Sequence, residues 1–217
     1  MLRSLLFPFI ALLMTTSSYG QGDFAGLARY QADNALRTSK VVFLGNSITD
    51  AWYARDTAFF ENNSFVGRGI SGQTSEQLLL RFRPDVVNLK PETVIIHIGT
   101  NDVAENTRPY SEDYTVGNIA SMIDIATQNN IRVILASVLP ATGFSWRPAL
   151  GDRSAAIVRL NERLKELAEE KGAHYLDYHT ALKNDRNGMD KEMAPDGVHP
   201  TMEGYEIMKE MVLKALR

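Results

Sequence analysis

Three residues at the two ends of the sequence have the types needed for nucleophilic catalysis. A serine hydroxyl becomes a good nucleophile when a histidine accepts its proton and a carboxylate orients that histidine. Ser47 lies near the start of the chain, and Asp196 and His199 lie near its end, separated by a short turn that contains Gly197. One loop can therefore supply both histidine and carboxylate. We expect Ser47 to be the nucleophile, His199 its base and Asp196 the orienting acid.

Attack on an ester also requires hydrogen-bond donors for the negative charge that develops on the carbonyl oxygen. The candidate donors are the backbone N–H of Ser47, the backbone N–H of Gly72 and the side-chain amide of Asn101. A glycine at position 72 lets the backbone approach a substrate closely, and the amide of Asn101 is a neutral donor that does not compete with His199 for the serine proton. These three groups form the expected oxyanion hole.

Strands and helices that alternate along the chain must position these residues. Short apolar runs predict strands at 40–44, 64–66, 93–98, 131–136 and 173–176, and helical periodicity predicts helices at 22–37, 75–83, 112–128, 153–171 and 201–216. Strands alternating with helices of this length indicate right-handed crossovers and a parallel sheet covered on both faces. In such sheets ligands bind beyond the carboxyl ends of the strands, so the chemistry is expected in the loops that follow them.

Four blocks of the sequence, in this order, resemble those of the SGNH (GDSL-type) serine hydrolase family. They are Gly45-Asn46-Ser47, Gly72, Gly99-Thr100-Asn101-Asp102 and Asp196-x-x-His199, and the resemblance extends from Lys40 to about Leu216. It implies an α/β protein of three layers (α/β/α) with a flavodoxin-like, central, parallel five-stranded sheet. It also implies hydrolysis without metal or cofactor, in which Ser47, Gly72, Asn101 and His199 are the residues that give the family its name and Asp196 completes the triad.

The sequence departs from the commonest family pattern at Asn46, where an aspartate usually precedes the nucleophile. Asn46 takes no part in proton transfer, so the departure leaves the proposed chemistry intact. Asparagine and aspartate both form turns through a side-chain oxygen. We expect Asn46 to keep such a hydrogen bond.

The first 20 residues have the pattern of a signal peptide, which leaves 21–217 as the hydrolase domain. Arg3 precedes an apolar run of about ten residues, too short for the roughly 20 that span a bilayer, and Ser18 and Gly20 are small residues suited to cleavage after Gly20. The sequence has no cysteine, hence no lipid-attachment cysteine and no disulfide. We expect a bacterial protein that is exported to the periplasm or the medium, with no stable membrane insertion.

The net charge and the spacing of potential metal ligands indicate which binding partners to expect. The formal net charge is −3, and removing Arg3 with the signal peptide makes it −4, which argues weakly against nucleic acid. No metal-ligand spacing is present, so we predict no metal and no cofactor. His97, His174 and His179 are interpreted as structural or surface residues. The sequence does not indicate the oligomeric state.

Five further residues are candidates for substrate binding, each with a structural alternative. Trp52 and Trp146 are expected in loops near the catalytic face, where a ring could stack on a sugar or pack against the core. Arg147 belongs to a long irregular stretch, 140–148, that could face the substrate or simply be solvated. Arg68 could bind an anionic or hydroxylated substrate or form a structural ion pair, and Asn46 adjoins the nucleophile.

These residues predict a secreted serine esterase that hydrolyses small O-acyl esters through an acyl-enzyme. Acetyl is the expected acyl group and an acetylated glycan the expected substrate, by family analogy and because no long apolar segment suits a fatty chain. One alternative is a lysophospholipase or thioesterase that acts on longer chains. The other, from a different class, is a carbohydrate-binding protein that has lost turnover, and the complete set of catalytic residue types argues against it.

Overall fold

A five-stranded, fully parallel sheet forms the centre of the protein in the computed structural model, which describes residues 22–217. The strands are β1 (Val41–Gly45), β2 (Phe65–Gly69), β3 (Thr93–His97), β4 (Arg132–Ala136) and β5 (His174–Leu176), in the spatial order β2-β1-β3-β4-β5. This is the flavodoxin-like order. The predicted fold class and all five strands are confirmed, whereas the predicted signal peptide (1–20) lies outside the described residues.

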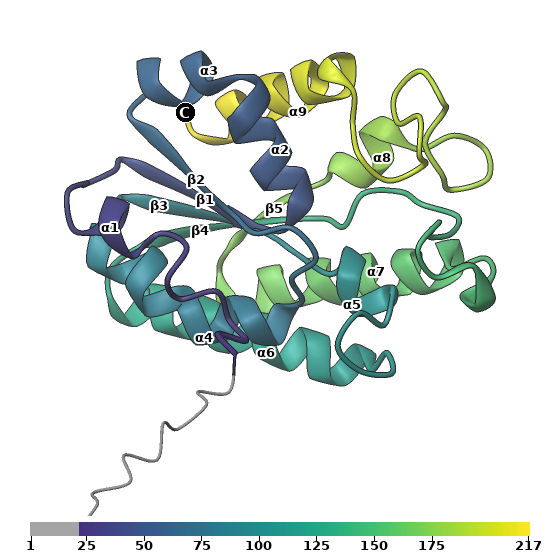
Figure 1. Ribbon diagram of the computed structural model, residues 1–217, viewed down its shortest axis with the longest axis horizontal. Coiled ribbons are helices and arrows are strands. Elements are labelled where there is room, and N and C mark those ends of the chain that lie inside the picture. Colours follow the sequence, from purple (N-terminus) through teal and green to yellow (C-terminus); the bar gives the residue numbers. More distant parts are fainter. Residues whose placement is uncertain (1–21) are drawn as a thin grey trace, which may run out of the picture.

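Helices cover both faces of the sheet and give the protein three layers (Figure 1). Helices α4 (Ser75–Asp85), α6 (Glu112–Gln128) and α7 (Ser154–Lys171) lie on one face, below the sheet in the figure. Helices α2 (Ser47–Arg55), α3 (Thr57–Asn62), α8 (Tyr178–Leu182) and α9 (Met202–Ala215) lie on the other. The short helices α1 (Gln31–Asn34) and α5 (Thr100–Val103), together with single 3-10 turns at Val87–Leu89 and Pro148–Leu150, complete the described elements.

The apolar runs become strands because the sheet buries both of their faces. Every residue of β1, β2 and β3 is buried, and β1 is paired on both sides, with β2 and with β3. Side chains that alternate along a strand therefore supply two separate cores. Val42, Leu44 and Ile96 belong to the core under α4, α6 and α7, and Phe43 and Ile95 to the core under α2 and α9.

The prediction of one helix over 22–37 is wrong. Only Gln31–Asn34 is helical, and the residues before it form turns. The side chain of Asp23 accepts hydrogen bonds from the backbone of Leu27 and Ala28, and Gly26 has φ +67°, a left-handed conformation that ends helical geometry. This N-terminal segment lies along the edge of the sheet near α4 instead of forming a full helix (Figure 1).

The order of the strands has a switch point between β1 and β3, where a ligand site is expected at the carboxyl edge of the sheet. The chain leaves β1 to reach β2 on one side and later reaches β3 on the other, so the connections diverge between β1 and β3. The loops after β1, β2 and β3 are those that carry Ser47, Gly72 and Asn101.

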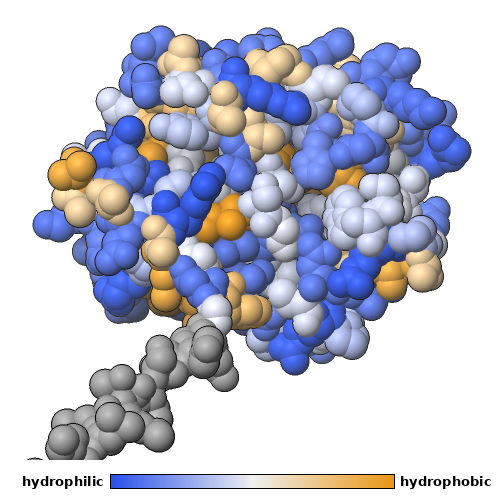
Figure 2. All heavy atoms as spheres, viewed as in Figure 1, coloured by the Kyte–Doolittle hydropathy of each residue, from blue (hydrophilic) through white to orange (hydrophobic). Residues whose placement is uncertain are grey.

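On the face shown in Figure 2, hydrophilic residues predominate and hydrophobic ones occur singly or in small groups. None of the helices described within 22–217 is long and apolar enough to span a bilayer.

Candidate active site

Ser47, His199 and Asp196 form a continuous series of hydrogen bonds at the carboxyl edge of the sheet. Ser47 Oγ lies 2.8 Å from His199 Nε2, and His199 Nδ1 lies 2.6 Å from Asp196 Oδ2. The other oxygen of Asp196 accepts hydrogen bonds from the backbone N–H groups of Val198 and His199. With Nδ1 facing a carboxylate, His199 presents Nε2 to the serine as a proton acceptor.

The electrostatics of Asp196 favour its ionised form. Partial burial alone would raise its pKa, but hydrogen bonds from the backbone and ring of His199 and from the backbone of Val198 outweigh burial, so the pKa lies below its ordinary value. The carboxylate is therefore negatively charged at neutral pH. A fixed negative charge stabilises the imidazolium that forms when His199 takes a proton.

Asn46 sets the position of the nucleophile at the start of α2. Its side-chain oxygen accepts a hydrogen bond of 3.0 Å from the backbone N–H of Ile48, and Ser47 is the first residue of the helix. This is the expected hydrogen bond, formed as an N-cap. The side chain is 1% exposed. Asn46 thus lies inside the protein, and the prediction that it contacts substrate is replaced by a role in holding the turn.

Gly72 lies in the loop after β2 and Asn101 at the start of α5 after β3, and Gln73 links the two segments. Gly72 has φ +81°, and a Cβ added there would meet nothing within 4 Å, so conformation and not space calls for glycine. Asn101, buried at the start of α5, donates from Nδ2 to the carbonyl of Gln73 at 3.0 Å. An amide nitrogen carries two hydrogens, so one remains available to a ligand.

Asp102, next to Asn101, is a buried carboxylate held by neutral donors. It accepts hydrogen bonds from the backbone N–H and hydroxyl of Ser75 and from the hydroxyl of Thr115. Burial raises its pKa to about 6, although these hydrogen bonds act in the opposite direction. Because Ser75 begins α4 and Asp102 lies in α5, this cluster joins the loops that carry Gly72 and Asn101.

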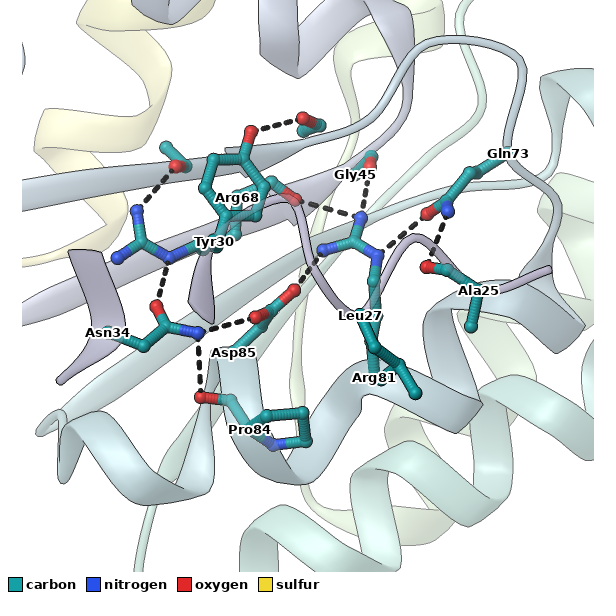
Figure 3. A network of polar contacts seen from close by, with 12 residues as sticks. Ala25, Leu27, Tyr30, Asn34, Gly45, Arg68, Gln73, Arg81, Pro84 and Asp85 are labelled. Atoms are coloured by element: carbon teal, nitrogen blue, oxygen red, sulfur yellow. Dashed lines mark hydrogen bonds and ion pairs between the residues drawn. The ribbon is translucent and has the colours of Figure 1, made fainter. Parts of the chain in front are cut away.

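Arg81 connects the ends of the strands that carry the site (Figure 3). This side chain of α4 is fully buried. One terminal nitrogen donates to the carbonyls of Gly45 and Arg68, the other to Asp85, and Nε donates to the side chain of Gln73. A single guanidinium therefore fixes the backbone just before the nucleophile loop, the end of β2, and the residue that follows Gly72.

Two candidate substrate-binding residues prove to be structural, which is the alternative that the sequence left open for each. Trp52 lies in α2 and not in a loop, is 2% exposed, and stacks between Phe59 and Tyr205. Arg68 lies within β2, is 1% exposed, and donates a hydrogen bond to the side chain of Asn34 (Figure 3). It also forms an ion pair of 2.7 Å with Asp33. Neither side chain reaches a surface where a substrate could bind.

The three other histidines have the predicted structural or surface positions. His97 is buried in β3, and burial lowers its pKa to about 4, so it is neutral at physiological pH. His179 is also buried, which lowers its pKa, and its backbone N–H donates to Ser137. His174 is exposed in β5.

Trp146 and Arg147 lie at the edge of the site, on the irregular segment after β4. The ring of Trp146 is 40% exposed and lies 6.4 Å from the ring of His199, centroid to centroid. Its indole N–H donates to Asn106 Oδ1, and Asn106 Nδ2 donates to the carbonyl of Gly72. Asn106 thus joins the exposed aromatic ring to the glycine loop, and Trp146 and Arg147 remain candidates for substrate contact.

The positioning residues Arg81, Gln73 and Asn106 were missed in the sequence. Arg81 and Asp85 stand four residues apart, among Leu78 and Phe82 on the apolar face of α4, and a charged pair on such a face is the signal that could have revealed them. Asn106 carries no comparable signal. Its contacts depend on two loops that meet only in the folded protein.

The protein has a flavodoxin-like sheet, and hydrogen bonds link a serine, a histidine and an aspartate in that order at its carboxyl edge. These features define a class of three-layer α/β hydrolases. Residues 43–207 match the sequence model of the GDSL-like lipase/acylhydrolase family, and the chain belongs to this family. The chain is thereby a carboxylic ester hydrolase by class, as the sequence predicted.

Individual relatives agree with this assignment. The chain shares 47% sequence identity with a GDSL-like lipase from Bacteroides thetaiotaomicron. Its structure superimposes on the crystal structure of that protein with a TM-score of 0.86, covering 88% of this chain and 97% of that one. An acetylxylan esterase from Geobacillus stearothermophilus is 25% identical over 82% of this chain and 93% of its own length. An uncharacterized lipoprotein from Bacillus subtilis is 27% identical over 64% of this chain, and the chain spans only 58% of that relative's length.

Proposed function

We propose that the protein is an exported serine esterase that removes short O-acyl groups, acetyl above all, from carbohydrates. The main support for serine catalysis is the series of hydrogen bonds from Asp196 through His199 to Ser47, with distances of 2.6 and 2.8 Å. Both distances lie in the range of strong hydrogen bonds, so the proton path requires no rearrangement before reaction.

In the proposed mechanism Ser47 Oγ attacks the ester carbonyl while its proton passes to His199 Nε2. The negative charge on the tetrahedral oxygen is stabilised by the backbone N–H groups of Ser47 and Gly72 and by the free amide hydrogen of Asn101. His199 then returns the proton to the oxygen of the leaving alcohol, and the acyl group stays on Ser47. A water molecule, deprotonated by His199, releases the acid and restores the serine.

Two observations support a short acyl group on a sugar. One is the relationship to a protein named acetylxylan esterase. The other is the composition of the cavity beside Trp146, which is lined by polar and charged side chains together with that tryptophan, prolines and Leu150. Such a lining suits a hydroxyl-rich alcohol better than a fatty chain.

Export is supported by the predicted signal peptide and by the relationship to a bacterial protein named as a lipoprotein.

Ser47→Ala tests the catalytic proposal. We expect kcat for p-nitrophenyl acetate to fall by at least about 10⁴-fold because no other group replaces the nucleophile. Circular dichroism and the urea midpoint serve as controls, since a small residue at the first position of α2 leaves the helix intact. A folded variant that keeps its activity would disprove the role of Ser47.

A series of p-nitrophenyl esters from acetate to octanoate tests the acyl group. We expect kcat/KM to decrease with chain length. An increase toward octanoate would instead favour the lysophospholipase or thioesterase, an alternative that agrees with the word lipase in the names of the family and of its B. thetaiotaomicron member.

A further inference from the structure

A cavity of about 460 Å³ is lined in part by Trp146, whose ring neighbours that of the catalytic His199. One wall is formed by residues 105–109 and the other by residues 146–150. One residue of each wall adjoins the site, because Asn106 donates a hydrogen bond to the carbonyl of Gly72 and the ring of Trp146 neighbours that of His199. The volume falls within the range of about 300–1,000 Å³ that is usual for small-molecule sites.

The position of the cavity identifies which part of an ester it receives. In the proposed reaction His199 must hand its proton to the oxygen of the leaving alcohol, so the alcohol lies on the side of His199 and not on that of the oxyanion donors. Trp146 is the aromatic ring next to His199. The part of the cavity that Trp146 lines therefore receives the alcohol part of the substrate.

Trp146 is a fixed and partly exposed ring. Its N–H donates to Asn106 at 2.9 Å, and its ring packs against Phe144 with centroids 5.2 Å apart. Both contacts restrict the side chain, so a ligand that lies on the ring costs little additional conformational entropy. A rigid aromatic surface with one polar edge suits the apolar face of a sugar ring better than a flexible chain.

The charges in the cavity favour an anion, although the whole chain has a net charge of −3. Two arginines, Arg108 and Arg147, and one acid, Glu105, line it. Glu105 is already paired with Arg153 at 2.8 Å, and Arg108 forms a longer contact of 3.5 Å with Glu76. Arg147 has no ion-pair partner among residues 22–217. Its charge remains available to a ligand.

We propose that this cavity binds an acidic sugar as the alcohol part of the ester, with the sugar ring on Trp146 and its carboxylate at Arg147. The proposal rests on the proposed esterase function and adds the chemical class of the substrate. Trp146 and Arg147 are adjacent in sequence, and both side chains border the same cavity. One ring and the carboxylate attached to it can therefore engage both residues.

The test compares sugars that differ only in charge. We measure kcat/KM for acetate release from mono-O-acetylated digalacturonate and from mono-O-acetylated galactobiose, in which a neutral hydroxymethyl group replaces each carboxylate. Wild-type protein should prefer the acidic sugar. Arg147→Gln should reduce the ratio of the two values by about 2- to 5-fold, the effect of a partly exposed ion pair, and Arg147→Lys should retain most of it.

Arg83→Gln is the matched control, because Arg83 is an exposed arginine of α4 that does not line the cavity. It should leave the ratio unchanged. High salt should reduce the preference of wild-type protein, since screening weakens exposed charge pairs. Equal ratios in wild type and Arg147→Gln would overturn the proposal while the esterase function stands. No Ser47-dependent release from any ester would reject the esterase function itself.

A third ester tests whether the cavity binds a phosphate group in place of a sugar carboxylate. If Arg147→Gln impairs hydrolysis of 1-acetylglycerol 3-phosphate but not of acetylated digalacturonate, the cavity binds phosphate and the acidic-sugar proposal is wrong. The expected result is the reverse.

Intrinsic fluorescence measures binding without turnover. The chain has two tryptophans, and since Trp52 is buried in the core, a ligand at the surface should alter the emission of Trp146 alone. Digalacturonate added to the Ser47→Ala protein should change the emission at lower concentrations than galactobiose does. Trp146→Phe should abolish the signal. Equal titrations with both sugars would contradict the role of Arg147.

Discussion

Asp102 shows how a single residue can connect the site to the stability of the protein. The carboxylate is 9% exposed and has donors but no cationic partner among its described hydrogen bonds. Ionisation of such a group costs free energy in the folded state, which is why burial raises its pKa to about 6. The cluster with Ser75 and Thr115 is therefore most stable when Asp102 is protonated.

The pH dependence of stability follows from this pKa. In the unfolded chain Asp102 releases its proton near its ordinary pKa of about 3.9, and in the folded protein near 6. The folded state binds more protons between these values, so this residue's contribution to the free energy of unfolding decreases as pH rises from 4 to 6. We expect the difference between wild type and Asp102→Asn to shift by up to about 3 kcal/mol over this range.

Urea unfolding of both proteins from pH 4 to pH 7 measures that difference. Every other titrating group is common to the two proteins, so its effect largely cancels. A difference that stays constant with pH would show that Asp102 keeps an ordinary pKa in the folded state.

At the scale of elements, α4 positions the site although none of its residues takes part in the proposed reaction. The helix begins with a capping box between Thr74 and Gln77, and its first residue, Ser75, binds Asp102. From its middle, Arg81 reaches the carbonyls of Gly45 and Arg68 (Figure 3). The helix thus holds the carboxyl ends of β1 and β2 at a fixed distance from the loop of Gly72.

Arg81→Lys tests this role. An ammonium on a flexible stem cannot satisfy the spread of acceptors that the planar guanidinium reaches, so the nucleophile and glycine loops should shift relative to each other. We expect kcat for p-nitrophenyl acetate, corrected for folded protein, to fall by about 10-fold with a smaller change in KM, because misplaced groups affect the transition state most.

The exposed Arg83 of the same helix again provides the control, and Arg83→Lys should retain full activity. A merely structural role for Arg81 would lower the urea midpoint and leave kcat of the folded fraction unchanged. That result would contradict a positioning role.

For the whole molecule, the sequence predicted those features that depend on local patterns. Apolar runs identified the strands because both faces of the central strands are buried, and the order of elements implied a parallel sheet. Ser47, His199 and Asp196 could be paired because few residue types perform this chemistry. The N-terminal segment was misjudged, and the role of Trp52 was left open with the residue wrongly placed in a loop. Only tertiary contacts distinguish a turn held by Asp23 from a helix, or a core tryptophan from a surface one.

Export is a prediction about the whole chain. Protein expressed with its own first 20 residues in a Gram-negative bacterium should reach the periplasm with Gln21 as its N-terminus, because the apolar run is short and followed by small residues. Cell fractionation and mass spectrometry of the intact protein measure both. Active protein that stays in the cytoplasm with Met1 to Gly20 attached would disprove it.

The contact between Ser47 and His199 joins residues 152 positions apart. It is supported by the neighbouring contact of α2 with α9, where the hydroxyl of Tyr205 binds the carbonyl of Ile48 and its ring stacks on Trp52. Contacts of such long sequence separation form only after much of the chain is ordered. We therefore expect the chain to be inactive until α9 has docked, so that activity in a refolding experiment returns no earlier than the contact of Tyr205 with α2.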